Sequence, residues 1–301
     1  MRILHIDTGR EMRGGQYQVL LLLDGLKRAG HDSTLMAYSK GPLWNEASAA
    51  GFPVLSAETK ELWRCAKEAT IVHAHDARAH TMAAIASRRK FVVSRRVAFP
   101  VRRSVASVWK YQRAARFLAV SHFVAQELQA AGIRNEKIDV VYDGVETMMH
   151  ATEWNPKSPV VALASNDPEK GRDLLEDAAH KAGARVLFSD DLAKDLRQAS
   201  LFVYITRSEG LGSAALLAMS TGVPVIASCV GGLVEVFADG VSGIFVRNDP
   251  EEIAVAIRRV LDNPSLAHSL IEHGRQRIAE CFTKEHLTRG TIAAYERALA
   301  T

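Results

Sequence analysis

The residues best suited to chemistry lie in a loop with two glycines in the second half of the chain. The loop reads Ser208-Glu209-Gly210-Leu211-Gly212-Ser213; it follows the apolar stretch 201–206 and precedes the helix-forming residues 214–219. Glycines let a backbone turn tightly and approach a ligand, and a helix N-terminus offers N–H groups and a positive dipole end. The loop therefore predicts a phosphate site, with the Glu209 carboxylate beside it to accept hydrogen bonds from sugar hydroxyls.

A longer pattern around this loop resembles the donor-binding segment of retaining GT-B glycosyltransferases, particularly glycosyltransferase family 4 (group 1). In that family the segment reads roughly S-E-G-x-G, then A-M-x-x-G-x-P-V-I-A-S, then G-G-x-x-E-x-x-x-D-G-x-x-G. This chain matches the three parts at 208–212, 218–228 and 231–243. The resemblance implies a nucleotide-sugar donor, a catalytic role for Glu209 and donor contacts from Ser208, Gly210, Leu211, Gly212, Ser213, Gly231 and Gly232.

Two positions depart from the family pattern. The family usually carries a second glutamate eight positions after the first, facing the nucleotide ribose, and this chain has Leu217 there. The family also carries an arginine five positions before a lysine, both facing the donor pyrophosphate. Lys170 matches the lysine, but Ser165 stands at the arginine position. The loss of one cationic partner to a phosphate would remove about 1.5–3 kcal/mol of binding free energy. The resemblance therefore implies that Lys170 is the catalytic cation.

A second cluster of candidate residues ends an apolar stretch, Ile71-Val72-His73-Ala74-His75-Asp76. Residues at i and i+2 of a strand share a face, so His73 and His75 should point the same way. The resemblance gives His75 a catalytic place beside the transferred sugar, while His73 is expected to be a buried, hydrogen-bonded core residue. A metal site from His73, His75, Asp76 and His80 is a disfavoured alternative, because Ala77 replaces the aspartate that H-x-H-x-D-H hydrolases need. No D-x-D sequence occurs, so a metal-bridged donor diphosphate is disfavoured as well.

The segment from Ala77 to Gln126 has no Asp or Glu and is rich in Arg, Lys and aromatic residues. Such a composition suits an anionic membrane surface or a phosphate-bearing acceptor. Arg95, Arg96 and Arg103 are predicted to bind an anionic glycan or glycolipid acceptor, because the first two follow a strand. A solvated basic face is the plain alternative, and no nucleic-acid motif accompanies the charge.

The remaining candidate is Gly14-Gly15, which follows a predicted first strand at 2–7 and precedes an amphipathic helix at 16–29. It predicts a second backbone N–H cradle for donor phosphates or acceptor. Further strands are expected at 31–38, 69–75, 91–94, 117–121, 138–142, 160–164, 185–189, 201–206, 223–228 and 243–246, with helices between them. This alternation predicts an α/β protein with parallel sheets.

The resemblance makes that architecture GT-B, two Rossmann-like domains facing across a cleft. We expect an acceptor domain at 1–146, a linker at 147–158, a donor-binding domain at 159–285, and a last helix at 286–301 that crosses back to the first domain. Residues 1–150 carry 22 Lys+Arg against 14 Asp+Glu, while the rest carry 16 against 20. The two halves are therefore electrostatically different.

Composition limits the classes of protein that remain. Apolar content of 48% and charged content of 24% are typical of a folded soluble chain, and no apolar run reaches the ~20 residues of a membrane span. Three scattered cysteines and no visible secretory signal favour the cytoplasm, with a peripheral place on the inner face of the membrane.

The family resemblance implies a metal-independent, retaining glycosyltransferase of hexosyl- or heptosyltransferase class that needs no cofactor. Its donor would be a nucleotide sugar, and its acceptor a hydroxyl of an envelope glycan or glycolipid, as in lipopolysaccharide biosynthesis. Nucleic acid is not an expected partner. Two alternatives remain open: a degenerate relative that binds a ligand without turnover, and a GT-B sugar-nucleotide epimerase.

Overall fold

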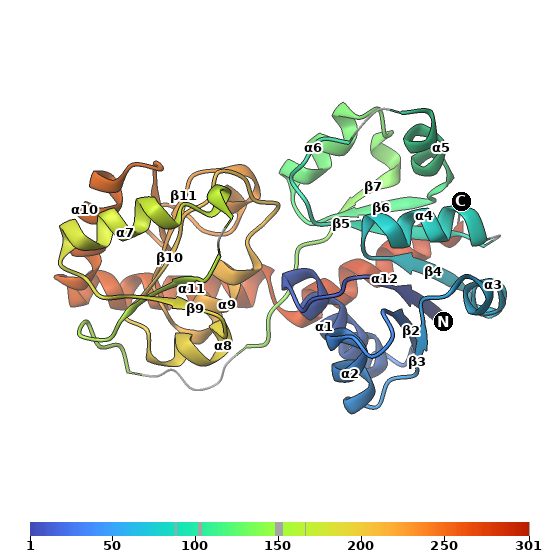
Figure 1. The fold of residues 1–301 in the computed structure, drawn as a ribbon, viewed down its shortest axis with the longest axis horizontal. Coiled ribbons are helices and arrows are strands. Elements are labelled where there is room, and N and C mark those ends of the chain that lie inside the picture. Colours follow the sequence, from blue (N-terminus) through green and yellow to red (C-terminus); the bar gives the residue numbers. More distant parts are fainter. Residues whose placement is uncertain (88, 102–103, 148–152, 166, 301) are drawn as a thin grey trace. The chain divides into compact units, whose positions relative to one another are not determined.

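The computed structural model describes residues 1–87, 89–101, 104–147, 153–165 and 167–300. The chain divides into two compact domains (Figure 1). The first comprises Met1–Gly144 and Lys284–Thr301, and the second Val145–Thr283. The predicted linker at 147–158 includes residues 148–152, which lie outside the described part of the chain.

The described residues of the first domain form a seven-stranded parallel sheet in the order β3-β2-β1-β4-β5-β6-β7. The strands are β1 (Arg2–Ile6), β2 (Asp32–Ala37), β3 (Val54–Ser56), β4 (Ile71–Ala74), β5 (Phe91–Arg95), β6 (Arg116–Ala119) and β7 (Ile138–Val140). The intervening helices are α1 (Gly14–Arg28), α2 (Pro42–Ala49), α3 (Thr59–Glu68), α4 (Ala77–Ala86), α5 (Val105–Arg113) and α6 (His122–Ala130). Strands β2 and β3 lie on one side of β1, and β4 pairs with β1 on the other side. The carboxyl ends of β1 and β4 therefore lie side by side.

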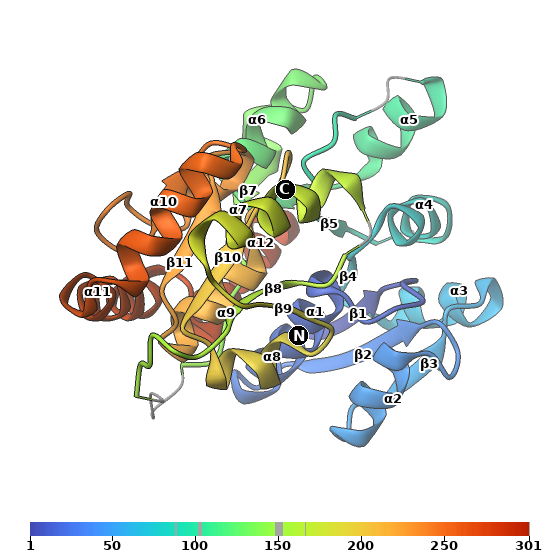
Figure 2. The same ribbon diagram turned by 60° about the vertical axis from the view of Figure 1, so that its left-hand side comes forward.

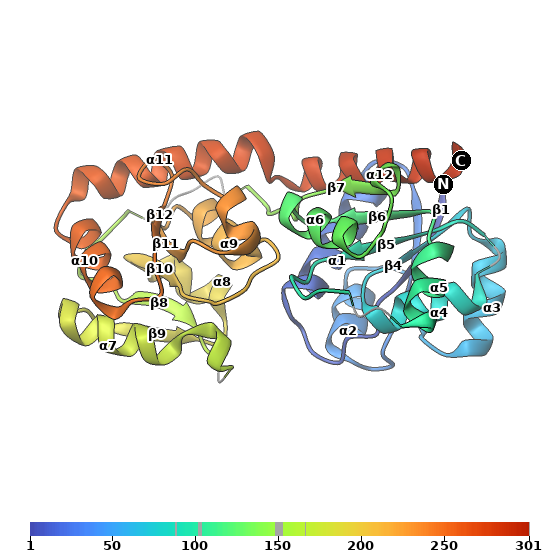
Figure 3. The same cartoon turned by 90° about the horizontal axis from the view of Figure 1, so that it is seen from above.

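The last helix, α12 (Lys284–Ala300), packs on the first domain (Figure 3). Its buried Leu287 and Tyr295 join a core cluster with Leu22 and Leu26 of α1. Gly25 permits the close approach of the two helices, because a Cβ there would lie 2.0 Å from the hydroxyl oxygen of Thr288. The first domain is therefore built from two segments that are far apart in the sequence.

The described residues of the second domain form a five-stranded parallel sheet in the order β12-β11-β10-β8-β9. The strands are β8 (Val160–Leu163), β9 (Val186–Ser189), β10 (Leu201–Tyr204), β11 (Val225–Ser228) and β12 (Ile244–Val246). The α-helices are α7 (Arg172–Ala182), α8 (Leu192–Asp195), α9 (Ser213–Thr221), α10 (Pro250–Leu261) and α11 (Pro264–Cys281). Helices α7 and α10 lie on one side of the sheet, and α8 and α9 on the other (Figure 2).

The predicted α/β class with two parallel sheets is confirmed. Strand β3 was not predicted, because three half-buried residues carry too little periodic pattern to distinguish them from a loop. Among the described residues, no helix combines the length and the apolar composition needed to cross a bilayer.

Candidate active site

The loop at 208–213 joins the carboxyl end of β10 to helix α9, as the sequence predicts. Gly212 occupies the N-cap position with a φ of 106°, a conformation that glycine adopts readily, and no side chain caps the helix there. Nine residues of α9 follow, from Ser213 to Thr221. A glycine rather than a serine or aspartate therefore stands at the N-cap, and the positive dipole end of α9 lies at the end of the 208–213 loop.

A second loop, Gly231-Gly232, holds the first one in place. The N–H of Gly232 donates to the carbonyl oxygen of Glu209 at 3.0 Å. Gly231 has a φ of 51°, and a Cβ there would lie 2.2 Å from that same carbonyl oxygen. A Cβ on Gly212 would lie 2.5 Å from a methyl group of Leu233. The glycines thus allow the two loops to touch, and their contact fixes the backbone of Glu209.

The Glu209 carboxylate lies in a network inside the second domain. Its Oε2 atom lies 3.0 Å from Nζ of Lys170 and accepts a short hydrogen bond from the hydroxyl of Tyr204. Its Oε1 atom accepts from the N–H of Gly210 at 3.0 Å. Burial, followed by the nearby carboxylate, raises the pKa of Tyr204 well above its ordinary value. Tyr204 therefore stays protonated and donates to Glu209 at neutral pH.

An uncharged residue stands at each of the two positions that depart from the family pattern. Leu217 is half-buried on α9, so that helix has no carboxylate at this position. The Ser165 hydroxyl accepts from the N–H of Asp167 at 3.2 Å and shapes the turn that leads to Lys170. Lys170 ends the short 3-10 helix Pro168–Lys170, and Gly171 follows it with a φ of 57°. Lys170 is consequently the cation that this turn presents beside Glu209.

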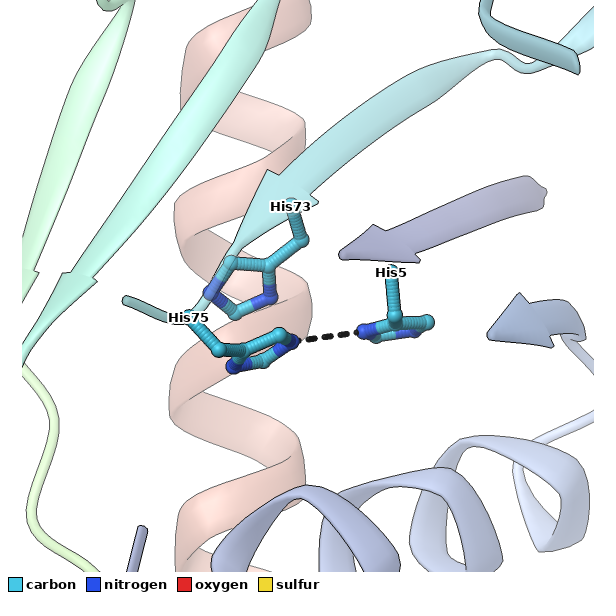
Figure 4. Close-up of side chains that lie close together, drawn as sticks. All are labelled: His5, His73 and His75. Carbon is cyan, nitrogen blue, oxygen red and sulfur yellow. Dashed lines mark hydrogen bonds between the residues drawn. The ribbon is translucent and has the colours of Figure 1, made fainter. Parts of the chain in front are cut away.

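Three buried histidines gather at the carboxyl ends of β1 and β4 in the first domain (Figure 4). Nδ1 of His5 lies 3.0 Å from Nε2 of His75. Both nitrogens of His73 are engaged, Nδ1 with the Tyr295 hydroxyl at 2.7 Å and Nε2 with that of Ser94 at 2.8 Å. His73 is therefore the hydrogen-bonded core residue that the sequence predicts. Among the described residues, Nδ1 of His75 and Nε2 of His5 are buried without a hydrogen-bond partner.

The histidine cluster contains hydrogen bonds, and it is also the group of side chains closest to a metal-ligand arrangement among the described residues. One nitrogen of each ring lies within 4.8 Å of the others. Nδ1 of His5 and Nε2 of His75 lie 3.0 Å apart, closer than the distance of about 3.4 Å that separates two ligands of a tetrahedral zinc ion, and both nitrogens of His73 already have hydrogen-bond partners. The remaining residues of the disfavoured set lie elsewhere. Asp76 caps α4, and His80 packs against Phe91, Tyr111 and Phe117.

Gly14 and Gly15 are the first two residues of α1, so the helix begins two residues earlier than the sequence predicts. The site also contains Asp7, which the sequence pattern marked only as the end of a strand. Asp7 is buried and accepts from the N–H of Gly9 at 2.8 Å and from the Gln16 amide at 3.0 Å. Burial raises the pKa of this carboxyl group. Gln16 thereby ties the start of α1 to the end of β1.

The candidate acceptor-binding arginines have partners within the first domain. Arg96 forms an ion pair with Asp143 at 2.9 Å, and only 14% of its side chain is exposed. Arg95 donates to the Tyr111 hydroxyl at 3.2 Å and to the carbonyl oxygen of Phe99. Nη1 of Arg96 is buried without a hydrogen-bond partner in the described part of the chain. Arg103 lies outside the described residues.

Solved structures define the class of fold. A complex of Anabaena Alr3699/HepE with UDP and glucose superposes with a TM-score of 0.84 at 18% identity, covering 97% of this chain and 98% of that one. The apo lipopolysaccharide outer core galactosyltransferase WaaB gives a TM-score of 0.73 at 15% identity, over 98% of this chain and 99% of that one. The fold is GT-B, as the sequence predicts.

Sequence models of two glycosyltransferase families match the two domains separately. Residues 160–277 match "Glycosyl transferases group 1", and residues 12–148 match "Glycosyltransferase Family 4". Together the two matches support a group 1 glycosyltransferase.

Curated relatives match over shorter stretches. A D-inositol 3-phosphate glycosyltransferase of Nocardioides sp. is 38% identical over 112 residues, which are 37% of this chain and 24% of the relative. The MMP alpha-(1->4)-mannosyltransferase of Mycolicibacterium hassiacum is 30% identical over 179 residues, 54% of this chain and 42% of the relative. The match thus spans less than half the length of either relative.

Proposed function

We propose that the protein transfers a sugar from a nucleotide-activated donor to a hydroxyl group of an anionic envelope glycan or glycolipid. The arrangement of Glu209, Lys170 and the uncapped start of α9 carries this proposal. A helix N-terminus and an ammonium suit a diphosphate, and a carboxylate beside them suits sugar hydroxyls. The names of the relatives, which are glycosyltransferases, and the UDP-containing structural neighbours support the same class of donor.

The proposed reaction is retaining and independent of metal. The acceptor oxygen bonds to the anomeric carbon on the face from which the donor diphosphate departs. The bond between that carbon and the phosphate oxygen breaks, and the proton of the acceptor hydroxyl passes to the departing phosphate oxygen. Lys170 and the amides of 210–213 stabilise the negative charge that develops on the leaving phosphate, and Glu209 orients the sugar. Lys170 thus supplies the positive charge that other glycosyltransferases take from a divalent ion.

In the first domain, we expect residues at the carboxyl edge of the sheet to bind the transferred sugar and the acceptor. Nδ1 of His75 is buried without a partner among the described residues, and a sugar or acceptor hydroxyl would supply one. Gly14 and Gly15 would offer backbone N–H groups at the start of α1. Arg95, Arg96 and Arg103 would attract the anionic acceptor, Arg96 through its unpartnered Nη1.

The exposed side chains of helix α5 support a peripheral place on an anionic membrane. Its outward side carries Val105, which is 89% exposed, with Val108 and Trp109 also exposed; Phe99, in the loop before it, is 68% exposed. The surrounding segment 77–126 has basic residues and no acidic ones. Exposed apolar side chains within a basic surface suit a membrane interface, where each nearby cation contributes about 1 kcal/mol. We propose that this face binds anionic lipid.

Leu217 and Ser165 favour a second candidate, a protein that binds a nucleotide sugar or partner without turnover. A panel of nucleotides and nucleotide sugars, followed by thermal unfolding, tests both candidates. A ligand at about 100 times its dissociation constant stabilises by about 2.7 kcal/mol, which is several degrees of melting temperature. Stabilisation together with slow donor hydrolysis supports the transferase. Stabilisation without hydrolysis or transfer to any envelope glycan supports the binder, and no stabilisation by any nucleotide refutes the donor site.

A further inference from the structure

The cation and the carboxylate of the candidate donor site bind each other. Nζ of Lys170 lies 3.0 Å from Oε2 of Glu209 and 3.4 Å from the Tyr204 hydroxyl. The side chain of Lys170 is 28% exposed and that of Glu209 is 18% exposed, so water screens the pair only in part. Each group therefore satisfies the other within the second domain.

From this contact we infer that the Lys170–Glu209 pair makes the site prefer an intact nucleotide sugar over the nucleoside diphosphate that remains after transfer. The inference rests on the proposed function, in which Lys170 binds the diphosphate and Glu209 the sugar. A nucleoside diphosphate that draws Lys170 away leaves Glu209 with one partner fewer. An intact donor replaces both partners, since its phosphate binds Lys170 and its hydroxyls bind Glu209. The pair thus opposes the product more than the substrate.

Lys170 is the member of the pair that is free to move. Glu209 is held by Tyr204 through its carboxylate and by Gly232 through its carbonyl oxygen. Lys170 reaches Glu209 through a flexible four-carbon stem from the end of a single 3-10 turn. The carboxylate therefore stays in place for the sugar when the ammonium turns to the phosphate. After transfer, the same ammonium returns to Glu209 and favours release of the diphosphate.

Calorimetric titration of the full chain with UDP and with UDP-glucose tests the inference, or with GDP and GDP-mannose if the nucleotide panel selects guanine. Glu209→Gln removes the charge that competes for Lys170 and keeps the shape of the side chain. We expect this variant to bind the diphosphate about three- to fivefold more tightly than the wild type, from the usual strength of a partly exposed ion pair. It should bind the nucleotide sugar no more tightly, so the preference for intact donor falls.

Two further variants separate the competition from a general charge effect. In a Lys170→Met background, Glu209→Gln should leave diphosphate affinity unchanged, because no ammonium remains to be released. Glu176→Gln removes the same charge from an exposed pair with Arg172 on α7, and should change diphosphate affinity less than about twofold. Equal or weaker diphosphate binding by Glu209→Gln overturns the inference. If the variant gives that result while the wild type binds donor and transfers sugar, the proposed function stands. If the wild type binds no nucleotide, the proposed function itself is refuted.

Discussion

Acid should destabilise the first domain through its buried histidines. Burial lowers the pKa of His5 and of His80 to about 3, and places that of His73 and His75 well below the ordinary value of 6.5. The unfolded chain therefore binds protons near pH 6.5 that the folded chain does not bind. The contribution of these histidines to the free energy of unfolding is therefore complete above about pH 6.5 and decreases as the pH falls below that value. Between pH 7.5 and pH 5.5, each such histidine should remove about 1.4 kcal/mol.

A single variant isolates one of these contributions. His80→Leu removes a titrating group from the aromatic cluster and leaves the raised pKa of Asp7, which acts in the opposite direction, as it was. Urea unfolding followed by tryptophan fluorescence reports mainly on the first domain, which contains Trp44, Trp63 and Trp109 of the four tryptophans. Between the two pH values, the variant should lose about 1.4 kcal/mol less than the wild type.

If His80→Leu loses as much stability on acidification as the wild type, the histidine is not held neutral by burial and the reasoning is wrong.

Three further changes test the remaining parts of the site. Gly231→Ala should lower transfer at least tenfold with little loss of the overall fold, because its Cβ would lie 2.2 Å from the Glu209 carbonyl oxygen. An unchanged kcat would show that the contact between the two loops does not affect catalysis. Tyr204→Phe removes a hydrogen bond to a carboxylate, worth about 1.5–3 kcal/mol, and kcat/KM should fall at least tenfold, whereas a normal value would exclude Tyr204 from positioning Glu209. Trp109→Ser should weaken sedimentation with phosphatidylglycerol vesicles, while Trp63→Ser, which has similar exposure on another helix, should not; equal effects would refute the α5 face.

Much of the fold can be predicted from local patterns in the sequence. Buried parallel strands appear as short apolar runs, and the helices between them carry clear caps, such as Asp249 before Pro250–Leu261. The start of α9 could also be predicted, because Gly210 and Gly212 precede a run of helix formers. Strand β3 could not, since its three half-buried residues show no period.

The partners within the site could not be predicted from local patterns. Lys170 and Glu209 are 39 positions apart, and only the packing of β8 beside β10 brings their loops together. Tyr204 appears in the sequence as one more apolar strand residue, although its hydroxyl reaches Glu209. Similarly, the ion pair between Arg96 and Asp143 joins two strand ends that are 47 positions apart.

The need for glycine in the donor loop also becomes clear only in three dimensions. The sequence pattern predicts that Gly231 and Gly232 contact the donor. The structure gives them a prior packing role, because Gly231 lies against the carbonyl oxygen of Glu209 and Gly232 donates to it. A close approach of two backbones carries no local sequence signal beyond the glycine itself.

The most direct test of the donor site is a crystal structure of the chain with the nucleotide sugar that stabilises it most. We predict that the diphosphate accepts hydrogen bonds from backbone amides of residues 210–213, that Nζ of Lys170 has left Glu209 to contact a phosphate oxygen, and that the Glu209 carboxylate accepts from a sugar hydroxyl. A diphosphate bound away from the start of α9, with the Lys170–Glu209 pair still closed, would contradict the proposed site.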